Sequence, residues 1–539
     1  MTALILALLL APPQQGSADA GLAAFREGRY EDAARLLQGA MVAAPSYEGL
    51  LSLGLAHGRL GRHAEAAAAF DRALALDAAR PEAWVERGGL RFLEKNYAAA
   101  ASDLRRALAL SEDAYTRDLL AASLHLAGRS EEALEVWNAL GRPRLRSLEI
   151  EGLQHTRDRV ARRELTLAEG DVLDVAKLRE SRLRLQELGI FDRVSFRSAP
   201  QGDGQADLDV IVTEQHGFAR SLPELAAVTA GYAARGTAHL RYANLAGTGI
   251  SLTANYRWQK RRPELSFAVT WPRPLGLPAV LQLRAFDGQQ EYVLAGEALR
   301  RDAKGLDLGL RRVLGSRTVG ELTLRTRDRS LSRARPDAPP GEIVGLEAGI
   351  ERRLLETHRH RLDGAMRLFG APAALGSDLR YARSLATLEY RGFLVPPDGV
   401  FFERSVLAAK LWWGAGSVGL PVDEMFAPGG SPEMELPLRA RRQRDGGALG
   451  ASPIGRTLLL GNLEWRQRVW GGAFAQWGTV LFCDAGHVGS TAEGPERTLI
   501  DVGLGLRVAL GGSLWVRADF GHGLADGSNA FFVNFGQVF

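Results

Sequence analysis

The sequence is poor in cysteine, in lysine and in long apolar runs. Cys483 is its single cysteine, which excludes an internal disulfide and a zinc site built from thiolates. Five of its 67 basic residues are lysines, and the basic surplus over 63 acidic residues is only four, so the charge does not indicate a nucleic-acid partner. No apolar run reaches the ~18–20 residues of a membrane-spanning helix. A polytopic helical membrane protein is therefore excluded, whereas a membrane barrel of alternating strands is not.

The length of 539 residues allows several domains, and 46% hydrophobic residues exclude a disordered chain. The N-terminus carries a short apolar core at residues 3–11, followed by two prolines and the small-polar-small sequence Ala18-Asp19-Ala20. This pattern predicts a signal peptide over residues 1–20 and export to a bacterial envelope, although no basic residue precedes the core. An ordinary first helix is the alternative.

A repeat follows the predicted signal peptide. The segment that begins Gly28-Arg29-Tyr30 recurs at residues 61–66, 95–100 and 128–133, and the alanine that ends each copy recurs at spacings of 33, 34 and 33 residues. Small residues at these positions let two helices approach closely, and glycine turns the chain between them. The pattern resembles tetratricopeptide repeats over residues 21–140. Such a solenoid presents a concave face to a protein partner or acts as a spacer.

A small mixed domain is predicted over residues 144–216. Residues 148–152 and 207–214 are typical of strands, residues 156–166 and 175–188 of helices, and a glycine at position 189 turns the chain into another strand. This strand-helix-helix-strand-strand order resembles a polypeptide-transport-associated (POTRA) domain. The resemblance implies a periplasmic α/β domain that can accept a client strand at its sheet edge.

From about residue 226 the helical period disappears and segments of about ten residues alternate between polar and apolar side chains, as at residues 249–258 and 513–520. This pattern predicts a transmembrane antiparallel β-barrel over residues 226–539, with sixteen strands. A soluble β-sandwich is the alternative. We therefore expect a multidomain chain: an α-solenoid, a small α/β domain and a C-terminal barrel.

The last strand ends in an aromatic residue and carries apolar side chains on one face, interrupted by Gln537. It resembles the β-signal by which outer-membrane barrels are recognised, and the residues that carry this resemblance are Phe531, Val533, Phe535 and Phe539. An open strand edge in lipid is prohibitive, so this strand must pair with the first one.

One segment of the barrel half, residues 421–457, is too long for a structureless loop unless it has a task. Two acidic residues follow it on strands: Glu464 lies on the face opposite Leu463, and Asp484 lies opposite Cys483. The alternation places both carboxylates in the lumen, and generic lumen polarity is the alternative explanation for them.

The order of these features resembles the outer-membrane insertase superfamily that contains BamA, TamA and the two-partner-secretion translocators. The resemblance implies a loop folded back into the barrel whose arginine, Arg439, pairs with Glu464 and Asp484. The glycine and aromatic residue that follow the arginine in that family are absent here, so Arg441 or Arg442 are alternatives. Residues 390–393 match the letters of the loop motif better, but no long loop contains them, so they are set aside.

The resemblance implies an outer-membrane assembly factor whose clients, unfolded β-barrel proteins, are captured by periplasmic domains and inserted at the barrel seam. Its partners would be the lipid bilayer, these clients and a periplasmic protein bound by the repeats, with no nucleic acid. A two-partner-secretion pore is the alternative, followed by a passive pore or scaffold. We expect no enzyme, no catalytic residue, no metal and no cofactor; His358 and His360 lie at a turn and are more typical of solvated residues.

Overall fold

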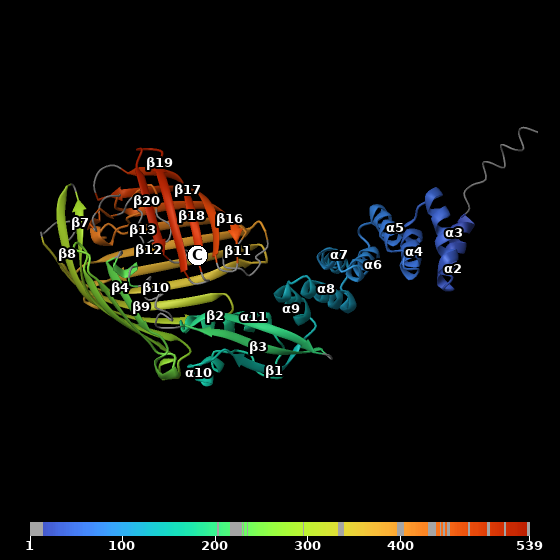
Figure 1. Cartoon of the computed structure of the whole chain (residues 1–539), viewed down its shortest axis with the longest axis horizontal. Coiled ribbons are helices and arrows are strands. Elements are labelled where there is room, and N and C mark those ends of the chain that lie inside the picture. The colour runs from blue at the N-terminus through green and yellow to red at the C-terminus, as the bar shows by residue number, and fades with distance from the viewer. Residues whose placement is uncertain are drawn as a thin grey trace, which may run out of the picture. The chain divides into compact units, whose positions relative to one another are not determined.

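The computed structural model (Figure 1) describes residues 15–201, 204–215, 229, 231–233, 236–294, 296–332, 339–395, 404–428, 438–441, 444–445, 448–449, 453–472, 475–492, 496–510 and 514–535. The chain forms two compact units. One holds Met1–Leu148, Leu167–Lys177 and Ser198–Leu208, and the other holds Glu149–Thr166, Leu178–Arg197 and Asp209–Phe539. Within the described residues, no helix is long and apolar enough to cross a membrane.

Residues 15–138 form an all-helical solenoid, coloured blue to teal in Figure 1. Neighbouring helices pair into four hairpins, namely α2 (Gln15–Arg26) with α3 (Tyr30–Ala43), α4 (Tyr47–Arg59) with α5 (His63–Leu76), α6 (Pro81–Leu93) with α7 (Tyr97–Leu110), and α8 (Ala114–Leu126) with α9 (Ser130–Asn138). The repeated alanines of the second helices, Ala33, Ala66, Ala100 and Ala133, are fully buried. The predicted repeat is therefore a stack of four helical hairpins.

The turn inside each hairpin needs a left-handed backbone residue. Gly28, Gly61 and Gly128 adopt positive φ angles of 75°, 72° and 77°, and Lys95 adopts 61° at the same place in the third repeat. Glycine takes this conformation without a steric penalty, whereas a lysine does not. The third turn is therefore the strained one.

Residues 144–214 form the small mixed domain. Its elements are β1 (Arg144–Glu151), α10 (Asp158–Arg162), α11 (Val175–Glu187), β2 (Phe191–Gln201) and β3 (Gln205–Glu214), and the sheet order is β1-β3-β2. The apolar face of α11 is buried through Leu178 and Leu185. The predicted strand and helix order is confirmed, although α10 is shorter than the helix predicted over residues 156–166.

The C-terminal half is a closed barrel in which consecutive wall strands pair antiparallel. Fifteen wall strands lie in the described residues, against the sixteen predicted: β4 (Thr237–Tyr242), β5 (Ser251–Arg257), β6 (Glu264–Pro272), β7 (Val280–Leu294), β8 (Glu297–Val313), β9 (Thr318–Leu331), β10 (Gly341–Glu356), β11 (His360–Ala371), β12 (Tyr381–Phe393), β13 (Ser405–Gly416), β16 (Gly455–Gly471), β17 (Ala475–Thr491), β18 (Arg497–Leu510), β19 (Leu514–Gly523) and β20 (Asn529–Phe535). Each pairs with its neighbour in sequence, β13 pairs directly with β16, and β20 lies next to β4.

The wall strands alternate as a membrane barrel requires. On β16, Leu463 and Trp465 are exposed on the outer face, whereas Glu464 is buried on the inner face. Apolar side chains on the outer face of nearly every wall strand form a continuous exposed belt, which on a soluble protein would be an aggregation hazard. The alternative of a soluble sandwich is therefore wrong.

Part of the mixed domain contacts the barrel within the second unit. Glu187 at the end of α11 accepts a hydrogen bond of 2.5 Å from Arg311 of β8, which also donates to Glu351 of β10 at 2.8 Å. Arg273, in the turn before β7, donates to Glu164 at 2.8 Å. Ion pairs therefore fix α11 and the residues after α10 at one end of the barrel.

The described residues bear on two further predictions. The cleavage site predicted after Ala20 falls inside α2, and residues 1–14 lie outside the described part of the chain. The segment 421–457 is not free of strands, because it contains β14 (Arg444–Asp445) and β15 (Ala448–Leu449), and β16 begins at Gly455. Backbone pairing of these short strands stabilises a loop that would otherwise leave its amide groups unpaired inside the barrel.

Candidate functional site: a loop anchored inside the barrel

The long loop between β13 and β16 enters the lumen through an apolar cluster. Phe426 lies in the first limb of the loop, residues 417–428, and Leu438 begins the next described part, the second limb. Both pack against inward-facing residues of β16, β17 and β18, namely Leu458, Leu460, Val488 and Leu499. The ring of Phe426 lies where Gly414 of β13 leaves room for it. Burial of these side chains draws the loop into the barrel and positions the charged residue that follows Leu438.

Arg439 is the largest fully buried side chain among the described residues, with 1% of its surface exposed. Its Nε and Nη2 donate to the two carboxylate oxygens of Asp484 at 2.7 and 2.5 Å, and its Nη1 donates to Glu464. The backbone N–H of Arg439 also donates to Asp484 at 3.2 Å. A planar guanidinium that bridges two carboxylates gives directional, charge-assisted hydrogen bonds, so the loop is held in one register.

The two carboxylates are themselves oriented from the wall. Asn462, which pairs with Asp484 across β16 and β17, donates to it at 2.8 Å. Arg466, two residues beyond Glu464 on the same strand face, donates to Glu464 at 2.7 Å. Both acids therefore arrive at Arg439 in fixed orientations, which lowers the entropy lost when the loop docks.

The two residues after Arg439 make further contacts with the wall. The backbone N–H of Ala440 donates to Asp501 of β18 at 2.9 Å. Arg441 pairs with Asp501 at 3.2 Å and with Asp526 in the turn between β19 and β20. Arg441 therefore extends the docking of Arg439 rather than replacing it, and Arg442 lies outside the described residues.

Aromatic and glycine residues make room for this docking. The guanidinium carbon of Arg439 lies 3.6 Å from the centre of the Phe482 ring, and that ring occupies the space left by Gly503. A Cβ atom at Gly521 of β19 would lie 2.4 Å from the carbonyl oxygen of Arg439. The loop backbone can therefore lie against the wall only because this position is glycine.

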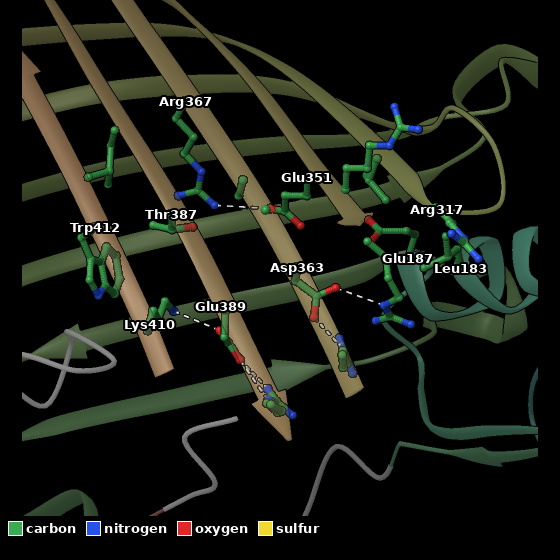
Figure 2. A pocket seen from close by; sticks show the side chains of 18 of the residues that line it. Leu183, Glu187, Arg317, Glu351, Asp363, Arg367, Thr387, Glu389, Lys410 and Trp412 are labelled. Carbon is green, nitrogen blue, oxygen red and sulfur yellow. Dashed lines mark hydrogen bonds and ion pairs between the residues drawn. The ribbon is translucent and has the colours of Figure 1, made fainter. Parts of the chain in front are cut away.

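Between α11 and the loop the lumen holds an open cavity of about 560 Å³ (Figure 2), and Trp412 of β13 borders both this cavity and the apolar cluster of the loop. Its walls come from β9 to β13 and from α11, whose Leu183 and Glu187 face it. Figure 2 shows pairs between wall residues: Lys410 lies 3.3 Å from Glu389, and Arg367 lies 3.5 Å from Glu351. The lumen is therefore filled by the loop at one end and solvent-accessible at the end where α11 lies.

The structure brings together the three residues that the sequence suggested for the loop contact: Arg439, Glu464 and Asp484. Arg391, the better letter match, lies in the wall strand β12 and pairs with Glu389 at 2.7 Å. The contributions of Asp501, Phe482 and Gly521 were missed, because no pattern separates them from other acidic, aromatic and glycine residues of a barrel.

The other predicted positions lie elsewhere. Phe531 and Val533 are exposed on the outer face of β20, Phe535 is its last residue, and Phe539 lies outside the described residues. His360 opens β11 and shares a hydrogen bond of 2.9 Å with the Tyr390 hydroxyl. In the described part of the chain, no cluster of histidine, cysteine and acidic residues has a geometry that could hold a metal ion.

Comparisons with known proteins define the class. Residues 143–215 match the family described as "Surface antigen variable number repeat" (POTRA), and residues 18–81 and 51–115 match the family described as "Tetratricopeptide repeat". The chain thus carries tetratricopeptide repeats, a POTRA domain and a barrel of the outer-membrane type, and the sequence prediction of these three parts is confirmed.

Individual proteins of known name are also similar to this chain. Over 68 residues the chain is 43% identical to the outer membrane protein assembly factor BamA of Nitratidesulfovibrio vulgaris, a match that spans 12% of this chain and 9% of that protein. CdiB from Escherichia coli has the same fold: at 12% identity the alignment covers 78% of this chain and 87% of that one, with a TM-score of 0.51. BamA from Haemophilus ducreyi lacking POTRA domains 1–3 aligns over 73% of this chain and 83% of that chain, at 15% identity and a TM-score of 0.44.

Proposed function

We propose that this protein assembles β-barrel proteins in the bacterial outer membrane, with its repeats and POTRA domain in the periplasm. The POTRA domain and repeats capture unfolded client chains or a periplasmic partner, and the barrel seam receives them. The similarity of a short segment to an outer membrane protein assembly factor supports this function. The observation that carries the proposal is the combination of a POTRA domain, whose α11 is tied to the barrel by an ion pair, with a short strand, β4, at the seam.

One of the two seam strands, β4, is short for a membrane wall. It has 6 residues, whereas β16 and β17 each have 17. At ~3.3 Å per residue, six residues reach ~20 Å along the strand, which is less than the ~25 Å of an apolar membrane band once the strand is tilted. A thin wall at the seam favours bilayer thinning beside it, and few hydrogen bonds then have to open before a client strand pairs there.

The loop anchor fits this role because it keeps the lumen closed while a client strand pairs at the seam. Arg439, Glu464 and Asp484 act as a lock between loop and wall, without catalytic chemistry or a cofactor. Insertion of a closed barrel into lipid is downhill once the strands pair, so the proposed reaction needs positioning rather than a chemical energy source.

A dedicated protein-translocation pore is the second candidate, and the open polar cavity at the α11 end favours it. A polypeptide that crosses through the lumen needs a hydrophilic path, which the charged cavity supplies at that end. The loop that fills the other end would then have to leave the lumen during each passage.

Depletion of the protein in its own host, followed by quantification of the outer-membrane proteome, tests the proposal. We expect a broad fall in β-barrel proteins with accumulation of their precursors in the periplasm. Loss of one secreted protein, with barrel levels unchanged, would establish the translocation pore instead. An unchanged outer-membrane and secreted proteome would refute both functions.

A further inference from the structure

We infer that the loop has a second anchor, in which Asp423 is held by Arg301 and Arg329, and that the two anchors together keep the loop across the lumen. This inference rests on the proposed locking role of the loop, and not on the assembly of client proteins. The second anchor lies on a different sector of the wall from Arg439 and has the opposite arrangement of charge.

Asp423 occupies the middle of the short 3-10 helix η5 (Val422–Glu424) in the first limb of the loop, and its side chain is completely buried. Arg329 of β9 donates from Nη2 to one carboxylate oxygen at 2.6 Å. Arg301 of β8 donates from Nη1 to the other oxygen at 3.1 Å. A loop carboxylate thus bridges two neighbouring wall strands, in the same way that Arg439 bridges Glu464 and Asp484.

Apolar contacts on both sides hold Asp423 in place. Leu420 packs in a cluster with Ile343, Phe369, Ala371 and Tyr381 of β10, β11 and β12. Val422 packs in another cluster with Tyr292, Leu294, Leu299 and Ile454. Both clusters are formed by residues near the strand ends on the loop side, such as Leu294, Ala371 and Tyr381, so the first limb is buried against the inner wall at that end of the barrel.

The charge balance makes the contact hard to break without a compensating change. Among the described residues, Nε and Nη1 of Arg329 and Nε of Arg301 are buried and find no hydrogen-bond acceptor. Asp423 is the acid that contacts both guanidinium groups directly. Withdrawal of the loop would leave two like charges facing each other in a poorly hydrated space, which is costly.

The two anchors are separated around the barrel. Strands β10, β11, β12 and β13 lie between β9, which carries Arg329, and β16, which carries Glu464. The loop backbone also pairs at Leu449 with Tyr292 of β7 and rests on Gly521 of β19. The described residues on either side of the loop are therefore held on different sectors of the wall, so loss of either anchor frees one limb of the loop.

The test is the ionic conductance of the purified full-length protein in planar bilayers, in the absence of any client. We expect Asp423→Asn to raise the open probability by roughly tenfold, as Arg439→Gln does, because each removes one anchor. Asp328→Asn is the matched control: Asp328 precedes Arg329 on β9, but its side chain is 63% exposed and its partner, Lys304 of β8 at 3.3 Å, is exposed as well. This control should conduct like the unmodified protein.

Asp423→Asn leaves two buried cations unneutralised and can impair folding. The heat-dependent shift in gel mobility shows whether the barrel of this variant is folded. Arg329→Gln is the second variant, because it leaves one acid facing one arginine and no unbalanced charge. We expect a smaller rise, roughly threefold. Wild-type open probability in Arg329→Gln, or an equal rise in Asp328→Asn, would overturn the second anchor. The conductance measurement uses no client, so it can contradict the second anchor while client assembly in complemented cells is normal. Client assembly can likewise be absent while the conductance supports the second anchor.

Discussion

The two ends of the lumen use the same residue types in opposite ways. At the loop end, Arg439 is 1% exposed and bridges two carboxylates, and apolar side chains cover the contact. At the α11 end, the side chains of Arg367 and Glu351 are 53% and 39% exposed and lie 3.5 Å apart in an open cavity. The difference is hydration: a buried pair fixes geometry because neither partner can be solvated alone, whereas a wet pair can exchange its partners for water.

The largest effects are therefore expected at the loop end. Arg439→Ala and Asp484→Ala should each lower the free energy of unfolding by about 3–5 kcal/mol, because each leaves an uncompensated buried charge. Both barrels should still fold, and cell growth after depletion should be complemented poorly. The double variant should add little, because the two residues share one interaction. The measurement is urea-induced unfolding in detergent together with complementation; fully normal behaviour of both single variants would refute the lock.

Gly521→Ala tests the same end through the backbone. The added Cβ would lie 2.4 Å from the Arg439 carbonyl oxygen, so the loop has to withdraw from β19. We expect a loss of about 1–3 kcal/mol, typical of an overpacked site. Gly461→Ala on β16 is the control, because its Cβ would meet nothing closer than 4.0 Å. Equal losses in the two variants would show that strand glycines, and not the loop contact, determine the effect.

A buried carboxylate in the POTRA domain sharpens the comparison, because its partners are backbone groups. Burial alone would raise the pKa of Glu214, but hydrogen bonds from the Thr156 side chain and from the N–H groups of Thr156, His155 and Gln154 outweigh it and lower the pKa. The stabilisation is therefore complete above the pKa of the unfolded chain and is lost as pH falls through the lowered pKa of the folded state.

Hydrogen exchange of residues 154–156 in the full chain measures this effect. We expect protection to fall as the solution is acidified into the range where Glu214 takes up its proton, with a loss of about 1–3 kcal/mol for these unpaired N–H groups. In Glu214→Gln the protection should be low at neutral pH and should no longer depend on pH. Glu149→Gln, at an exposed position of β1, should leave the profile unchanged.

The smallest effect is expected in the open cavity. Arg367→Ala removes a half-exposed partner from a contact of 3.5 Å, so unfolding free energy should change by less than about 1 kcal/mol. The same urea titration used for Arg439→Ala checks this value. A loss as large as that of Arg439→Ala would break the comparison, because it would show that the cavity is as poorly hydrated as the loop end.

Local periodicity explains how much of the molecule was predictable. The 33- and 34-residue spacing predicts the helical hairpins, and polar-apolar alternation predicts that Glu464 and Asp484 face the lumen, because side chains on a strand repeat every two residues. The choice between Arg439 and Arg441 was left open, because a contact between a loop and a distant strand has no local signal. Asp423 was not anticipated for the same reason: its partners are two of many arginines, and the ring order of the strands brings them to it.

Cys483, the single cysteine of the chain, has a practical consequence. It is exposed on the outer face of β17, and the next residue, Asp484, points inward to Arg439. A thiol-reactive fluorophore attached there would sit on the outside of the barrel, one peptide bond away from the lock. The natural protein therefore offers a single spectroscopic site at which movement of the strand can be followed from the lipid side while the lumen is left unmodified.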